Sequence, residues 1–175
     1  PPVTIFDLLF VVDNSNSMDR IQSDLGEAFP GTISELAASE LDFQVAVTTT
    51  DMMASGNGNQ GDLRSSDPIG APGCEGFEAV TAETGSLASL VDVGVNGSGD
   101  EQGIFAATVA LCMAQTPSWW SDLETLPEDN PTRVLCSAVP TANRTCNSGF
   151  LREGSAVVVS IFSDEGDDTE RLEVF

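Results

Sequence analysis

The segment from Val3 to Val12 constrains the fold of this chain more than any other. It reads Val-Thr-Ile-Phe-Asp-Leu-Leu-Phe-Val-Val, an almost continuous apolar run rich in branched and aromatic residues. Such a run is typical of a strand that is covered on both faces within a parallel sheet. It is too short to cross a bilayer and is interrupted by Asp7, so no membrane span is expected. We therefore predict a central strand of an α/β sheet.

The rest of the chain alternates between helix-like and strand-like segments. In the first helix-like segment, which Pro30-Gly31 is expected to kink or split, apolar residues recur at Ile21, Leu25, Phe29 and Ile33. Further helices are expected at residues 87–93 and 101–114, and further strands at 41–50 and 156–162. This order predicts an α/β fold with a doubly wound, mostly parallel sheet and helices on both of its faces.

A chain of 175 residues has the length of one domain and is long enough to bury a hydrophobic core. Two stretches, at about residues 52–85 and 116–154, contain many turn-forming residues and show little periodicity. We therefore expect a single domain over residues 1–175 that carries two loop-rich insertions.

The charge of the chain is strongly one-sided. Its formal net charge is −22, from 28 acidic residues against six arginines, with no lysine and no histidine. Nucleic acid is not an expected partner, because phosphate binding needs clustered cations. The charge either keeps an extracellular or salt-adapted protein soluble or serves a binding site, and both readings predict that cations gather on this surface.

The four cysteines predict disulfide bonds rather than a zinc site. They include no Cys-x-x-Cys pair, and no histidine is available to complete a zinc site. Cys136 and Cys146 flank a segment rich in Pro, Thr and Asn, which favours a bond between them and leaves Cys74 for Cys112. Disulfides indicate an oxidising compartment, so an extracellular or cell-surface location is expected.

The segment Asp13-Asn-Ser-Asn-Ser17 follows the first predicted strand directly. In an open α/β sheet, ligands bind beyond the carboxyl ends of the strands. Asp13 offers a carboxylate, and Ser15 and Ser17 offer hydroxyls, which are hard ligands suited to Mg²⁺, Ca²⁺ or Mn²⁺. The same residues can instead form an Asx turn and a helix cap, and for this motif alone that structural interpretation is the stronger.

Two further segments bring oxygen ligands to the same edge of the sheet and favour a cation site. Asp164 follows the third strong strand, and Ser98, Asp100 and Glu101 lie in a glycine-rich turn before a helix. Asp51, at the end of the second strand, is expected to reach this edge as well. The predicted ligands of one divalent cation are Asp13, Ser15, Ser17 and Asp164, with Ser98 or Glu101 nearby.

These residues resemble the metal-ion-dependent adhesion site of the von Willebrand factor type A (VWA) family. The family's Asp-x-Ser-x-Ser motif is matched by Asp13, Ser15 and Ser17, its loop threonine by Ser98, and its third element by Asp164. The phrases Val-Thr-Thr-Thr-Asp51, Gly-Phe-Leu-Arg152 and Phe-Ser-Asp-Glu165 look like those of a secreted bacterial branch. The resemblance extends from about residue 3 to residue 168, interrupted by the two insertions.

The chain departs from the VWA pattern at two points. Ser98 replaces the family's threonine, and the neighbouring Asp100 and Glu101 offer alternative ligands that would change the charge of the site. The family's sheet has two more strands after the position of Asp164, so the C-terminal strands are expected to be missing from these 175 residues. They would come from further sequence or from another chain that completes the sheet.

The resemblance implies an extracellular adhesion or protein-binding module. In the family, the bound cation keeps one coordination position open for an acidic group of a partner, so a protein or glycan ligand is expected. A structural subunit of a surface appendage is the alternative. A metal-dependent hydrolase is less favoured, because the chain has no histidine, no lysine for a phosphate and no second carboxylate cluster.

Overall fold

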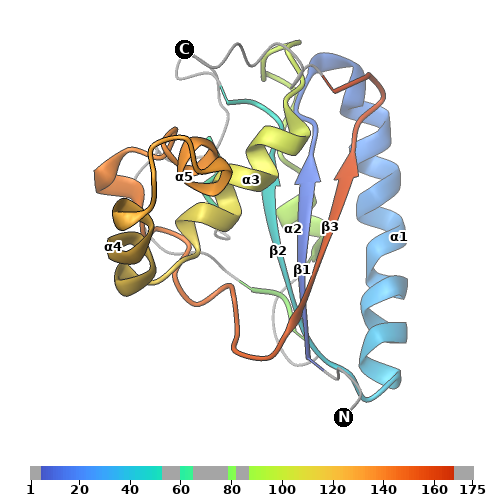
Figure 1. Cartoon of the computed structure of the whole chain (residues 1–175). Helices are drawn as coiled ribbons and strands as arrows, with labels where there is room; N and C mark the ends of the chain where they lie inside the picture. The colour runs from blue at the N-terminus through green and yellow to red at the C-terminus, as the bar shows by residue number, and fades with distance from the viewer. Residues whose placement is uncertain (1–4, 53–59, 65–78, 82–86, 168–175) are drawn as a thin grey trace.

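A computed structural model describes residues 5–52, 60–64, 79–81 and 87–167. Three parallel strands form one sheet in the order β2-β1-β3. They are β1 (Ile5–Val12), β2 (Asp42–Thr49) and β3 (Ala156–Phe162), with β1 in the centre (Figure 1). The prediction of an α/β fold built on a parallel sheet is therefore confirmed at this level, and the third strand has the predicted bounds.

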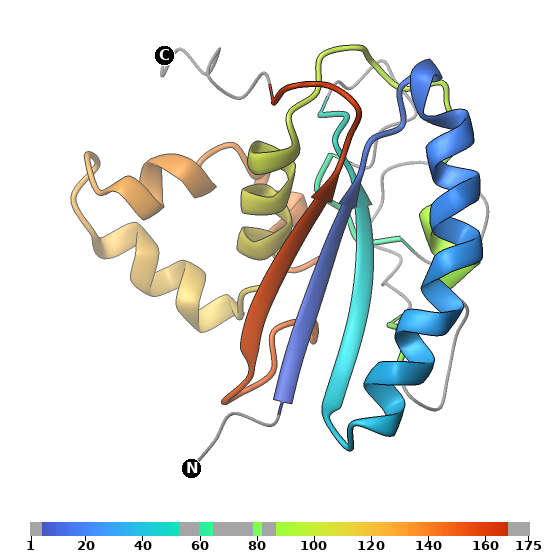
Figure 2. The same ribbon diagram turned by 90° about the vertical axis from the view of Figure 1, so that its right-hand side faces the viewer.

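Helices cover both faces of this small sheet (Figure 2). One face is covered by α1 (Asp19–Ala38), which follows the short 3-10 helix η1 (Asn16–Met18), and by α2 (Leu87–Val91). The other face is covered by α3 (Gly103–Met113). Beyond α3 lie α4 (Pro117–Thr125), α5 (Pro131–Cys136) and the 3-10 helix η2 (Thr141–Asn143).

Alternation along β1 explains the two layers of core. Phe10 and Val12 point toward α1 and α2, whereas Leu9 and Val11 point toward the alanine-rich face of α3. All four side chains are buried, as expected for a central strand between two helical layers. The small side chains of α3 let this helix lie close to the sheet, and Phe150 fills the space beside them.

The helix α1 runs without interruption through Pro30, so of the two predicted alternatives, a kink or a split, the split does not occur. Pro30 and Gly31 lie on the exposed side of the helix. The preceding residue, Phe29, is buried, with its ring centroid 5.1 Å from that of Phe10 and 5.5 Å from that of Phe162. This packing against the sheet offsets the backbone hydrogen bond that proline cannot make.

The predicted disulfide pairs are wrong, because Cys112 of α3 is bonded to Cys136 of α5, with Cα atoms 5.7 Å apart. Cys146 is disulfide-bonded too, and Cys74 lies outside the described residues. The error came from treating residues 116–154 as loop. This stretch forms two helices and folds back on α3, so Cys136 meets Cys112, which is 24 residues away in the sequence.

At the amino-terminal end of the sheet, a buried carboxylate fixes the chain that enters β3. Asp7 of β1 is fully buried and accepts hydrogen bonds from the Arg152 backbone N–H (2.8 Å) and side-chain Nε (2.7 Å). Gln44 Nε2 and Ser155 Oγ also donate to Asp7. The Arg152 guanidinium also forms an ion pair with Asp42 of β2, with Nη1 2.6 Å from Oδ1. The loop before β3 is thereby tied to both other strands.

Replacing Arg152 by alanine is expected to lower the free energy of unfolding by about 3 kcal/mol or more, because Asp7 would stay buried without its charged partner. Urea unfolding measures this loss. Arg20→Ala is the control, because Arg20 is 91% exposed and forms a surface ion pair with Asp24. It should cost about 0.5 kcal/mol or less. Equal losses in the two variants would contradict the prediction.

Candidate metal centre

The parallel register brings the residues that follow the three strands to one edge of the sheet. Val12 lies opposite Thr49 on one side and Phe162 on the other. The next residues in the chain are therefore neighbours: Asp13 after β1, Thr50 after β2 and Ser163 after β3. The Asp13 backbone N–H donates to the Phe162 carbonyl at 2.9 Å and extends the pairing past the strand.

Asp13 is fully buried and occupies the centre of this edge. Its Oδ1 accepts a hydrogen bond from the Ser15 backbone N–H at 2.7 Å, which forms an Asx turn, and its Oδ2 accepts from Ser163 Oγ at 2.7 Å. Gln22 of α1 holds the backbone below it, donating from Nε2 to the Asp13 carbonyl at 2.8 Å and to the Gly94 carbonyl at 2.9 Å. The carboxylate is therefore held in one orientation.

The two serines of the motif face Asp164 from the other side of the edge. Ser15 Oγ and Ser17 Oγ are 3.0 Å apart, and Ser17 Oγ donates to Asp164 Oδ1 at 3.1 Å. Neither η1 nor α1 has a side-chain hydrogen bond at its N-cap, so the interpretation of Ser17 as a helix cap does not hold. Ser17 and Asp164 are exposed, so this end of the cluster is open to solvent while Asp13 is not.

The glycine-rich turn is pressed directly against the Asp13 loop. The Gly97 backbone N–H donates to the Asn14 carbonyl at 2.8 Å, and a Cβ atom at position 97 would lie only 2.4 Å from the Asn14 side chain. This approach requires glycine. Ser98 is held by its backbone N–H, which donates to Asp51 Oδ2 at 3.1 Å, while its own hydroxyl accepts from the Asp100 backbone N–H at 3.0 Å. Its hydroxyl is thus engaged within the turn.

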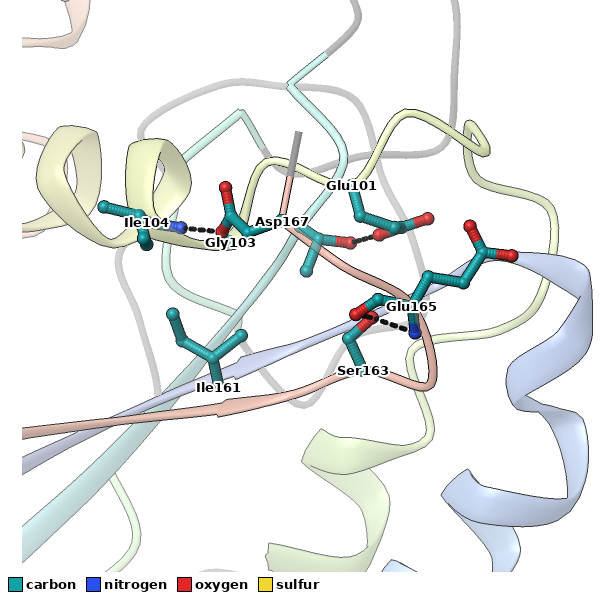
Figure 3. Close-up of a pocket in the computed structure, with 8 residues that line it drawn as sticks. Glu101, Gly103, Ile104, Ile161, Ser163, Glu165 and Asp167 are labelled. Atoms are coloured by element: carbon teal, nitrogen blue, oxygen red, sulfur yellow. Dashed lines mark hydrogen bonds between the residues drawn. The ribbon is translucent and has the colours of Figure 1, made fainter. Parts of the chain in front are cut away.

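Glu101 is the residue of this turn whose carboxylate lies beside Asp13. Figure 3 shows it in the pocket that it lines together with Ser163 and Glu165. It is only 1% exposed. Its Oε2 accepts a hydrogen bond from Thr50 Oγ1, whereas its Oε1 is buried without a hydrogen-bond donor. The pKa of Glu101 is raised to about 7. Burial is the largest cause, the Thr50 hydrogen bond opposes it, and the charge of Asp13, a hydrogen bond with the Asp13 side chain and the charge of Glu165 add to the rise.

Side-chain hydrogen bonds thus link Ser15, Ser17 and Asp164, and the Ser15 backbone N–H connects this group to the Asp13 carboxylate. Glu101 lies beside Asp13, while the Ser98 hydroxyl is turned to its own loop. Sequence reasoning missed three residues that organise this edge: Gln22, Thr50 and Ser163. Thr50 and Ser163 follow strand ends, so their positions could have identified them. Gln22 carries no signal in the sequence, because its role depends on where α1 crosses the edge.

The donor set fits a hard divalent cation in its chemistry. Carboxylate and hydroxyl oxygens are the preferred ligands of Mg²⁺ and Ca²⁺. The Glu101 oxygen that has no hydrogen-bond donor is buried, so the ionised carboxylate is costly without a positive charge nearby. Within the part of the chain that the structure describes, no group of three or more His, Cys, Asp or Glu side chains is arranged to hold a metal. A cation here would therefore depend on serine hydroxyls together with carboxylates.

The fold and this edge define an α/β protein with a cluster of carboxylates and hydroxyls at the carboxyl ends of its parallel strands. Comparisons with protein-family profiles, curated proteins and solved structures gave no significant match. Among the described residues, no helix is long and apolar enough to cross a membrane.

In metal-free protein, Glu101 should make stability fall with rising pH. A carboxyl whose pKa is raised by folding contributes stability below its unfolded pKa of 4.5, and that stability is lost as pH rises through about 7. Glu101→Gln removes the effect. In EDTA, the stability of this variant relative to wild type should therefore increase by roughly 1–3 kcal/mol between pH 5 and 8.

Urea unfolding at several pH values tests this prediction. Glu128→Gln removes one negative charge from an exposed position and reports what net charge alone contributes. If the two glutamine variants show the same pH trend, the burial of Glu101 has no role in it.

Proposed function

We propose that this chain is a VWA-like, doubly wound α/β domain that binds a partner through a divalent cation. The cation would be held by Asp13, Ser15, Ser17 and Asp164, with Glu101 as the ligand from the glycine-rich turn. The order of these elements along the chain, together with helices on both faces of a parallel sheet, supports the family assignment. Glu101 then takes the place that the resemblance gave to Ser98.

One observation carries this proposal: the carboxyl groups of Glu101 and Asp13 are both buried and lie against each other, and Glu101 Oε1 has no N–H or hydroxyl donor. An anionic oxygen removed from water is costly unless positive charge or a donor compensates for it. Among the arginines that the structure describes, none contributes to the cluster, and the chain has no lysine or histidine. Below its raised pKa of about 7 Glu101 is neutral by protonation, whereas above it a divalent cation at this edge would compensate the two carboxylates.

The open side of the cluster supports binding rather than a purely structural role for the cation. Ser17 and Asp164 are exposed, so a cation held by them would be reachable from solvent. A hard cation accepts further oxygen ligands, such as an acidic group of a partner protein or an oxygen of a glycan. Binding of this kind requires no covalent chemistry, so we propose an adhesion module and not an enzyme.

An extracellular or cell-surface setting agrees with the composition and the covalent structure. The Cys112–Cys136 bond ties α5 to α3, and disulfides of this kind persist in oxidising compartments. Many acidic residues also suit a protein that works among abundant Ca²⁺ and Mg²⁺ ions.

Calorimetric titration of the EDTA-stripped protein with CaCl₂ and MgCl₂ tests the proposal. Wild type should bind one cation, and Asp13→Ala and Asp164→Asn should each weaken binding by more than about tenfold, since each removes a charged ligand. Asp129→Asn is the matched control, because it removes one charge from an exposed loop position. It should leave the affinity nearly unchanged. Equal loss in all three variants would indicate general attraction by net charge and contradict a defined site.

A second candidate function, a structural subunit of a surface assembly, is favoured by the outer edge of β3. Val157, Val158, Val159 and Ile161 are 39–42% exposed on the strand that ends the described sheet. Such an edge invites strand addition. The strand Ala156–Phe162 carries no charge, so two copies could pair along it without like-charge contact despite the net charge of −22. We take a second copy of this chain as the added partner.

Sedimentation equilibrium over a range of concentrations tests this second function. Self-association that is abolished by Val158→Asp would support it, because a charge on an edge strand blocks pairing. Thermal melting of the variant checks that it still folds. A stable, cooperatively melting monomer of the wild-type chain would exclude it.

A further inference from the structure

Residues 94–100 cross the carboxyl-terminal edge of the sheet from one helical layer to the other (Figure 1). They follow α2 and Val93, which are buried in the core on one face, and they precede α3, which covers the other face. All of these residues are described by the structure, and none of their side chains belongs to the hydrophobic core. We call residues 94–100 the crossing segment.

The crossing segment is held to its surroundings by hydrogen bonds of its backbone. The Gly97 N–H donates to the Asn14 carbonyl at 2.8 Å, and the Ser98 N–H donates to Asp51 Oδ2 at 3.1 Å. The Gly94 carbonyl accepts from the glutamine side chain of α1 at 2.9 Å. Segments with few buried apolar contacts and with hydrogen bonds near the surface are those that open locally while the rest of a domain stays folded.

Asn14, which lies directly beneath Gly97, makes the closed position of the crossing segment costly. Its side chain is fully buried, and neither Oδ1 nor Nδ2 has a hydrogen-bond partner among the residues that the structure describes. A Cβ atom at position 97 would lie 2.4 Å from Asn14 Oδ1 and 2.5 Å from Nδ2, so the Gly97 backbone itself covers this amide. A buried amide without partners has lost its hydrogen bonds to water and has gained none in return.

We propose that the crossing segment is a lid that opens in the free protein by moving Gly97 away from Asn14. Val93 and Glu101, which are both buried, are its fixed ends. The glycine-rich backbone between them adopts new conformations at little cost. Opening lets water reach the Asn14 amide next to Asp13, so the lid governs how the candidate metal centre is reached from this side. The opening requires no cation, and the inference therefore stands apart from the proposed function.

Amide hydrogen exchange of ¹⁵N-labelled protein in EDTA tests the lid. The Gly97 N–H should be protected at least about tenfold less than the Asp13 N–H, which donates to the Phe162 carbonyl at the sheet edge, because the lid opens without breaking the sheet. Asn14→Ala removes the amide that the closed lid buries, and it should raise the protection of Gly97 by about tenfold. Asn16→Ala is the matched control, because Asn16 is exposed in the same loop and should leave this protection nearly unchanged.

Gly97→Ala should have the opposite effect, because its methyl group would collide with the Asn14 amide and displace the lid. Protection of the Ser98 N–H should fall by about tenfold or more, and Asn14→Ala in the same chain should restore most of it. Thermal melting checks that each variant folds.

Two results would overturn the inference. One is equal protection of the Gly97 and Asp13 amides in the wild-type chain, because the crossing segment would then open only when the whole domain unfolds. The other is Gly97 protection that Asn14→Ala leaves unchanged or lowers, because the buried amide would then not favour opening. Neither result depends on cation binding, which the CaCl₂ titration described above tests separately.

Discussion

The parallel register of the three strands is the constraint on which the rest of this structure depends. Because β1 pairs with both β2 and β3 up to its last residue, all three strands end at the same level, with Val12 between Thr49 and Phe162. Asp13 and Ser163 meet only for this reason. A slip of one residue in either pairing would turn every side chain of that strand to the opposite face of the sheet. Its residues would then face the wrong helical layer, and the residues that follow the strands would no longer lie side by side.

The two ends of the sheet compensate a buried carboxylate in different ways. Asp7 at the amino-terminal end receives hydrogen bonds from Arg152, Gln44 and Ser155, so its charge is matched within the chain. Glu101 at the carboxyl-terminal end has the Thr50 hydroxyl as its hydrogen-bond donor and negative charges as neighbours. The first arrangement stabilises the fold by itself. The second leaves two carboxyl groups in contact, so that Glu101 is either protonated or in need of a positive charge, which is why we propose a function for this end.

The sequence allowed the strands and the Asp13 and Asp164 positions to be predicted, because these features are local: an apolar run, then a polar residue where the strand ends. Features that depend on tertiary packing could not be predicted. The continuity of α1 through Pro30 rests on Phe29 packing against the sheet. The Cys112–Cys136 bond rests on α5 folding back onto α3. The choice of Glu101 over Ser98 as the proposed cation ligand from the glycine-rich turn depends on which side chain is buried against Asp13. No simple pattern in a loop sequence indicates which of its side chains is buried.

The net charge of −22 makes it necessary to distinguish a defined site from diffuse attraction of cations. Charges spread over an exposed surface are screened over about 8 Å at physiological ionic strength, so their effect on binding falls steeply with added salt. Asp13 and Glu101 are buried and therefore screened much less. Cation binding at this edge should accordingly persist at salt concentrations that abolish attraction to the exposed carboxylates. The buried and the exposed carboxylates differ in this way because the sheet register, and not the composition, brings Asp13 and Glu101 together.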